Sequence, residues 1–194
     1  MSEKEKMLIG DIYNANYDEE LINERLKCKD LCYKYNSISP SKVEERDKVL
    51  RSIVSNMKER CIIEQPFYCD YGYNIEFGEN FYANHNLVIL DPAKVKFGDD
   101  VFVGPNCGFY TANHPLDFER RNEGLEYAKP IIVGNNVWLG GNVVVLSGVT
   151  IGDNVVIGAG SVVTKDIPSN SLAIGSPCRV VKKLNEEGKG TSFV

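Results

Sequence analysis

Aliphatic residues recur at every sixth position along the C-terminal half of the chain, in two interleaved series. The first series is Ile131, Val137, Val143, Val149 and Val155, and the second is Val133, Leu139, Val145, Ile151, Ile157 and Val163. Glycine follows the second series at positions 134, 140, 152 and 158. Strands have a side-chain period of two and helices one of 3.6, so neither explains this pattern. A short strand, a corner and another short strand does, with the aliphatic side chains inside and glycine taking a positive φ at the corner.

Three such sides close one triangular coil of eighteen residues, and coils stack about 4.8 Å apart through parallel hydrogen bonds. The period also runs through an earlier stretch, in Ile63, Cys69, Ile75, Phe81 and Leu87, with a slip of two residues near "LDPAKV". The sequence therefore predicts a mainly β fold, a parallel β-helix of hexapeptide repeats. The period alone does not fix the handedness of the coil.

The first sixty residues have helical spacing instead. One apolar stripe is Leu21, Leu26, Cys28, Cys32 and Tyr35, and a second is Leu50, Ile53, Val54 and Met57. Asp18 is placed to cap the first helix, and Ser41 with Glu44 has the spacing of a capping box. We expect a helical hairpin that packs on the main body, with Cys28 and Cys32 facing its core. The expected organisation is a helical segment over 1–60, a β-helix over 61–185 and a tail over 186–194.

The totals are those of a soluble protein, with 43% hydrophobic and 25% charged residues. A net charge of −5 argues against nucleic acid or an anionic membrane as the main partner. The start "MSEKEKMLIG" lacks the apolar core of a signal peptide, and no apolar run approaches the length that spans a membrane. The six cysteines form no CxxC pair, so we expect a cytoplasmic protein with free thiols and no zinc knuckle.

An irregular loop over residues 111–130, "TANHPLDFERRNEGLEYAKP", interrupts the repeat and carries His114, one of two histidines. Functional residues concentrate on loops held by rigid scaffolds. Imidazole is also the side chain whose ordinary pKa suits a general base near neutrality. His114 is therefore the candidate base, although a surface histidine before a proline turn is the alternative.

Other positions depart from the repeat. Asn84 takes the corner position that glycine holds elsewhere, either because asparagine tolerates a positive φ or because its amide faces a ligand. Gly141, Ala159 and Pro177 lie eighteen apart and so would stack into a strip with little side chain. Such a strip is either tight corner packing or a groove for a long, thin ligand. The basic residues of "GSPCRVVKK" near its end suit phosphate.

Five segments, taken in order, carry a family resemblance: "GDIYNANYDEELINERLKCKDL", "FYCDYGYNIEFGENFYANHN", "TANHPLD", "PIIVGNNVWLG" and "GAGSVVTKDIPSNSLAIGSPCRV". With them the chain resembles the maltose and galactoside O-acetyltransferases, which are hexapeptide-repeat acyltransferases. The resemblance covers roughly residues 7–185. It implies a left-handed β-helix, a homotrimer with active sites between subunits, acetyl-CoA as the acetyl donor and a sugar hydroxyl as the acceptor, with no metal.

By position, the resemblance implies roles for individual residues. His114 matches the catalytic histidine, and Asn84 matches the asparagine beside the reacting acetyl group. The positions that match acceptor contacts are Asp70, Glu126, Trp138 and Asn16. The positions that match coenzyme A contacts are Asn84, Gly141, Ala159, Thr164, Lys165, Arg179 and Lys182.

Some family members have serine at positions 70 and 141, where this chain has aspartate and glycine. An N-terminal acidic contact of some members also has no clean match around Asn16. These departures leave the acceptor open. An antibiotic or an amino acid is one alternative to a sugar, and a non-catalytic binding solenoid is another. A zinc enzyme of the carbonic anhydrase kind binds its metal through three histidines. This chain has two, which argues against that class of enzyme.

Overall fold

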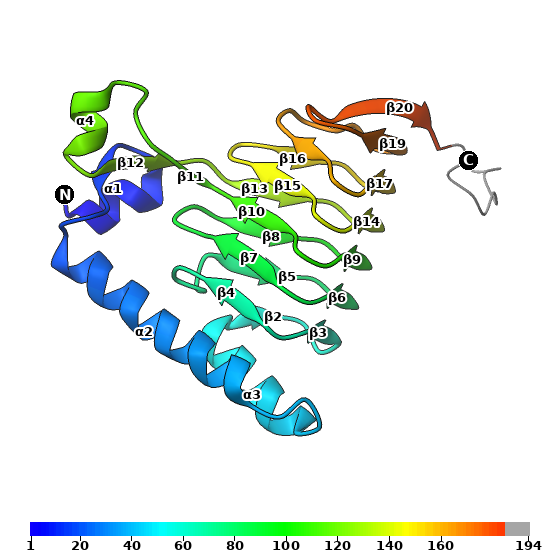
Figure 1. Ribbon diagram of the computed structural model, residues 1–194, viewed down its shortest axis with the longest axis horizontal. Helices are drawn as coiled ribbons and strands as arrows, with labels where there is room; N and C mark the ends of the chain where they lie inside the picture. The colour runs from blue at the N-terminus through cyan, green and yellow to red at the C-terminus, as the bar shows by residue number, and fades with distance from the viewer. Residues whose placement is uncertain (185–194) are drawn as a thin grey trace.

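The computed structural model describes residues 1–184, and the expected tail over 186–194 lies outside them. Short parallel strands stack into a triangular prism with three faces (Figure 1). The β4 face holds β4 (Phe67–Cys69), β7 (Leu87–Leu90), β10 (Gly108–Tyr110), β15 (Val144–Leu146) and β18 (Val162–Val163). The β2 face holds β2 (Asn56–Met57), β5 (Ile75–Phe77), β8 (Val95–Phe97), β13 (Ile131–Val133) and β16 (Thr150–Ile151). The β3 face holds β3 (Cys61–Ile63), β6 (Phe81–Ala83), β9 (Val101–Val103), β14 (Val137–Leu139), β17 (Val155–Ile157), β19 (Ser171–Ile174) and the antiparallel β20 (Arg179–Lys183).

The inward positions predicted from the sixfold period are confirmed. Every member of both C-terminal series is at most 2% exposed, and these side chains form one continuous core inside the prism. Because burial of apolar side chains drives folding, this internal column holds the coils together. The fold class predicted from the sequence, a parallel β-helix with a helical N-terminal segment and a protruding loop, is confirmed.

Coil length varies along the stack. The register sets Cys61 beside Phe81, Val137 beside Val155, and Val155 beside Ser171, so the repeat is twenty residues early, eighteen in the middle and sixteen in the last coil. The expected stacking of Pro177 on Ala159 is therefore wrong. The shorter last coil brings Gly175 to that level, where its carbonyl accepts a hydrogen bond from the Val162 amide.

The corner conformation differs from the one predicted. The glycines at 78, 98 and 134 do not have positive φ; that conformation falls two residues later, on Asn80, Asp100 and Asn136. These glycines are required by close approach, because a Cβ on Gly78 would lie 2.2 Å from the backbone oxygen of Gly98 in the next coil. Asn84 likewise lacks a positive φ, so conformational tolerance does not explain its presence.

This packing predicts a large stability difference between two glycine substitutions. Gly78→Ala forces a methyl group against the backbone of the next coil, and overpacking of this kind costs about 3 kcal/mol. Gly160 has a φ of +72° but no atom within 4 Å of an added Cβ, so Gly160→Ala costs only about 1 kcal/mol of backbone strain. At fixed protein concentration, the Gly78→Ala midpoint of thermal unfolding should fall by roughly 6–12 °C, against 2–4 °C for Gly160→Ala. Equal midpoints would contradict the close-approach explanation.

Two helices, α2 (Glu19–Ser37) and α3 (Val43–Ile53), close the N-terminal end of the prism, at the bottom of the stack in Figure 1. The short helix α1 (Glu3–Ile9) lies beside the projecting loop instead, and its Met7 packs in a separate apolar cluster with Tyr13 and Leu21. The predicted Asp18 cap is confirmed by its hydrogen bond from the Leu21 amide. The predicted capping box is wrong, because α3 is preceded by Lys42 at the cap position without a side-chain bond. Leu26 was expected in the buried stripe but is 54% exposed.

The loop over residues 111–130 has secondary structure of its own. It contains β11 (Ala112–Asn113), α4 (Phe118–Asn122) and β12 (Leu125–Ala128), and β12 also pairs with β1 (Tyr13–Asn14) from the N-terminal segment. A three-stranded sheet thus joins the loop to β1 of the N-terminal segment and projects from one corner of the prism (Figure 1). Among residues 1–184, no helix combines the length and the apolar character needed to cross a membrane.

Candidate active site

His114 lies directly after β11, at the base of the projecting loop. Its Nδ1 is 3.0 Å from the carbonyl oxygen of Leu125 on β12. A carbonyl oxygen only accepts, so Nδ1 carries the hydrogen and the neutral ring keeps a lone pair on Nε2. The imidazole is 45% exposed. The loop therefore holds one histidine in the tautomer that can take a proton at Nε2.

Glu126 faces the same ring. Its Oε1 lies 3.7 Å from Nε2 of His114, and its Oε2 accepts a 2.7 Å hydrogen bond from the Tyr13 hydroxyl. The side chain is 18% exposed. Burial, and then the Glu126 charge, raise the pKa of Tyr13, which therefore stays a neutral donor. Pairing of β1 with β12 places Tyr13 opposite Glu126, so the N-terminal segment fixes this carboxylate.

A pocket of about 410 Å³ brings together four of the residues predicted from the sequence: His114, Glu126, Asp70 and Asn16. Asp70 follows the last residue of β4. Burial raises the pKa of its carboxyl group, and the nearby charge of Arg25 opposes that shift. The pocket lies at the corner between the β4 and β2 faces, because Asp70 and Pro92 follow strands of the first face and precede strands of the second.

A buried carboxylate builds this corner. Asp91 is 0% exposed and accepts backbone hydrogen bonds from Asp70, Tyr71 and Gly72 at 2.8–3.0 Å. Burial raises its pKa to about 7 in spite of these bonds. The turn that presents Asp70 is therefore held from inside the protein.

Several residues of this pocket are not predicted from the sequence, above all Arg25. Its guanidinium donates to the Tyr71 hydroxyl at 2.7 Å and to the carbonyl of Ala15. The helical spacing of Leu21, Arg25 and Lys29 puts these residues on adjacent turns of one side of α2. This spacing is the sequence pattern from which Arg25 and Lys29 could have been predicted to lie on one side of the helix. Leu90, Pro92, Tyr110 and Ala112 complete the lining.

Asn84 and Trp138 line a different pocket, of about 510 Å³, with Tyr82, Phe102 and Gly104. Asn84 is half-buried, and its Oδ1 accepts the His85 amide at 2.7 Å. This pocket lies where the β3 face meets the β4 face. The β4 face separates it from the His114 pocket by about six residues, or on the order of 20 Å. Within one chain, the structure does not bring Asn84 and Trp138 to the histidine.

The residues matched to coenzyme contacts lie on the later coils. Gly141 and Ala159 are neighbours in adjacent coils, because the Gly160 amide bonds to the Gly141 carbonyl at 2.9 Å. Thr164 and Lys165 are exposed and follow β18. The remaining two, Arg179 and Lys182, are exposed on β20, where Lys182 pairs with Leu172. The Cys178 amide bonds to the Val162 carbonyl, which brings the start of β20 to the Asn84 side of the β4 face.

Comparison with known proteins agrees with this architecture. Residues 6–57 match the maltose acetyltransferase hexapeptide capping motif, and residues 130–165 match the bacterial transferase hexapeptide repeat. A putative acetyltransferase of Saccharomyces cerevisiae is 51% identical over 97% of this chain and 96% of its own length.

Two solved structures are also similar. The first, a maltose O-acetyltransferase from Clostridium difficile, is 52% identical, with a TM-score of 0.92 over 96% of this chain and 99% of the other. The second, a galactoside acetyltransferase in complex with coenzyme A, is 44% identical, with a TM-score of 0.94 over 100% and 96% of the two chains.

The stacked hexapeptide coils and these relatives define an enzyme of the hexapeptide-repeat acetyltransferase class. The capping motif at the N-terminus narrows this class further. The chain belongs to the maltose and galactoside O-acetyltransferase family.

Proposed function

We propose that this protein transfers an acetyl group from acetyl-CoA to a hydroxyl group of a sugar, with His114 as the general base. The observation that carries the proposal is the His114 pocket, in which a fixed imidazole with its Nε2 lone pair faces a set of polar side chains. Relatives with bound coenzyme A and with sugar acceptors in their names support the choice of donor and acceptor.

In the proposed reaction, Nε2 of His114 takes the proton from the acceptor hydroxyl as its oxygen attacks the thioester carbon. The tetrahedral oxyanion that forms is stabilised by a backbone amide near Gly141 and by the amide of Asn84. The imidazolium then returns its proton to the departing thiolate of coenzyme A. The acceptor proton thus ends on the sulfur of coenzyme A and the acetyl group on the acceptor oxygen. These steps include neither a covalent enzyme intermediate nor a metal ion.

In this proposal, the carboxylates of Asp70 and Glu126 and the residues around them bind the acceptor. Asp70 and Glu126 accept hydrogen bonds from sugar hydroxyls, while Asn16 and Arg25 bound the pocket on the N-terminal side. A polyol fixed in this way presents one hydroxyl to the histidine, and such orientation accounts for much of the rate that an enzyme gains. Trp138 supplies an exposed aromatic surface on the other side of the site.

A homotrimer brings the two half-sites together. Successive strands of the β3 face align Ile62, Tyr82, Phe102 and Trp138 in one outward row, of which three are 43–55% exposed. A contiguous apolar row is typical of a surface that packs against another chain. Cyclic packing of three prisms covers this row and sets the Asn84 edge of one subunit against the His114 corner of the next. The coenzyme then lies in the cleft between subunits.

An acceptor panel tests the proposed substrate class. Free-thiol release from acetyl-CoA should rise at least about tenfold above hydrolysis with maltose, glucose or a galactoside, because the pocket offers carboxylate acceptors for several hydroxyls. The comparison acceptors are chloramphenicol and serine, each with one or two hydroxyls. Thiol release with these compounds alone would reject the sugar assignment while leaving the acetyl transfer itself in place.

A further inference from the structure

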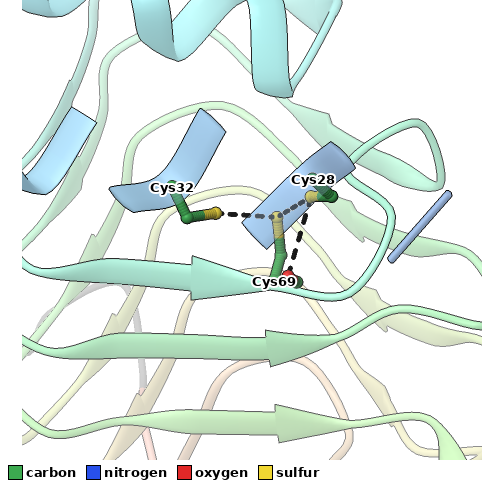
Figure 2. A group of neighbouring side chains, drawn as sticks. All are labelled: Cys28, Cys32 and Cys69. Atoms are coloured by element: carbon green, nitrogen blue, oxygen red, sulfur yellow. Dashed lines mark hydrogen bonds between the residues drawn. The ribbon is translucent and has the colours of Figure 1, made fainter. Parts of the chain in front are cut away.

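Three cysteine thiols meet where α2 lies on the first coil. Cys28 and Cys32 are one helical turn apart on α2, and Cys69 is the last residue of β4 (Figure 2). The Sγ atom of Cys69 lies 3.5 Å from that of Cys28 and 4.0 Å from that of Cys32, and all three sulfurs lie within 4.8 Å of one another. All three are free thiols. They come from two segments far apart in sequence, so their convergence is a property of the fold.

The cluster is enclosed but can be reached from solvent. The three cysteines are 2–5% exposed. A pocket of about 420 Å³ borders Cys32 and Cys69, with Lys29 and Asp70 also in its lining. This pocket gives a small ion a path to the sulfurs, and the Lys29 ammonium lies beside that path. The buried carboxyl group of Asp91 lies close by, since it accepts the backbone amide of Asp70, the residue that follows Cys69.

The spacing of the sulfurs fits a shared metal ion. Three sulfurs bonded to one centre at about 2.3 Å lie about 4 Å apart, which is close to the two separations found here. Cysteine coordinates metals as the thiolate, so an ion that binds here displaces the thiol protons.

We propose that Cys28, Cys32 and Cys69 form a three-sulfur binding site for a thiophilic ion, Cu(I). Soft thiolates select Cu(I), zinc and iron–sulfur clusters. Structural zinc takes four ligands, and iron–sulfur clusters are held by four. Among residues 1–184, no histidine, aspartate or glutamate joins these sulfurs as a fourth ligand. Cu(I) accepts three sulfurs in a plane, and its binding releases the protons of the thiols that coordinate it.

The bound ion would link α2 to the first coil beside the candidate acceptor pocket. Arg25 and Lys29 lie on α2 within a turn of Cys28, and Asp70 follows Cys69 directly; all three line the His114 pocket. Ligation therefore stabilises the helix that carries one wall of that pocket. This site is separate from the proposed acetyl transfer, which uses none of the three sulfurs.

Anaerobic titration of the reduced full-length protein with Cu(I), in competition with a coloured Cu(I) chelator, tests the site. We expect one Cu(I) per chain, and X-ray absorption showing three sulfur neighbours at about 2.3 Å. Saturation at a hundred times the dissociation constant should raise the unfolding midpoint by about 5–10 °C. The sulfur count and the midpoint are read on the unmodified protein, so they do not depend on whether a variant folds.

Serine variants assign the ligands. Cys28→Ser and Cys69→Ser should each weaken Cu(I) binding by more than about 100-fold, since loss of an outer-shell partner alone costs 10- to 100-fold. Cys107→Ser is the matched control, because Cys107 is a buried free thiol outside the cluster, and its affinity should be unchanged. Cu(I) binding that survives Cys69→Ser, a two-sulfur linear site, or preferential binding of Zn(II) with four ligands would each overturn the proposal.

Discussion

Replacement of His114 by alanine should lower kcat for sugar acetylation by about 10²–10⁴-fold, the range that general base catalysis contributes. The reason is geometric. The hydrogen bond from Nδ1 to the Leu125 carbonyl fixes the ring with its Nε2 lone pair over the pocket, and alanine leaves no group there that can take the acceptor proton. Steady-state thiol release with the best acceptor of the panel measures the effect. KM for acetyl-CoA should change little, because the residues that we propose as coenzyme contacts lie outside the His114 pocket.

The other histidine provides the matched control. His85 is exposed, and its ring contacts the Gln65 carbonyl at 2.7 Å at a different corner of the prism. His85→Ala should keep kcat within about threefold of the unmodified enzyme, as is usual for a surface substitution. His114→Gln separates loss of the base from loss of packing, since the amide fills much of the same space without accepting a proton. Full activity in either His114 variant would end the assignment of this residue as the base.

The sixfold period predicted the coils and their core because each repeat places an aliphatic residue at the same inward position. An inward aliphatic residue such as Val137 or Leu139 is buried whichever coil it belongs to, so the error in one repeat does not propagate. The same reasoning failed at the corners. Most of these corners hold both a glycine and an asparagine or aspartate, and the sequence does not show which of them has the positive φ. In the structure Asn80 has the positive φ, whereas Gly78 lies against the backbone of the next coil.

The candidate site was predictable only in part, since its geometry depends on long-range contacts. The sequence predicts His114 as a candidate because it lies in a loop that interrupts the repeat. Its orientation, however, depends on the Leu125 carbonyl of β12, and that of Glu126 depends on Tyr13, which is 113 residues away in the chain. Cys28 and Cys32 were expected in a helix core, and that is confirmed. Their meeting with Cys69 depends on how α2 crosses the first coil, and no pattern within either segment contains that information.

Mixing two inactive variants should restore activity if each active site is shared between subunits. His114→Ala removes the proposed base, and Asn84→Ala removes a proposed oxyanion donor, a loss that costs about 10²–10³-fold in kcat. In a cyclic trimer, any hybrid of the two variants contains one junction with an intact His114 and an intact Asn84. Random assembly from equal amounts then gives about one quarter of the junctions as intact sites. The two subunit types are unfolded together and refolded, and kcat is compared with that of each variant refolded alone.

A control mixture and the expected yield of activity distinguish shared active sites from sites within one chain. A mixture of His114→Ala with His114→Gln carries both lesions in the same half-site, so it should stay as inactive as its components. In contrast, the His114→Ala and Asn84→Ala mixture should recover about 25% of full activity, far above the sum of the two variants. Activity that remains at that sum would mean that each chain builds its own site. The separation of the two pockets at different corners of the prism argues against that outcome, because Asn84 and His114 share no pocket within one chain.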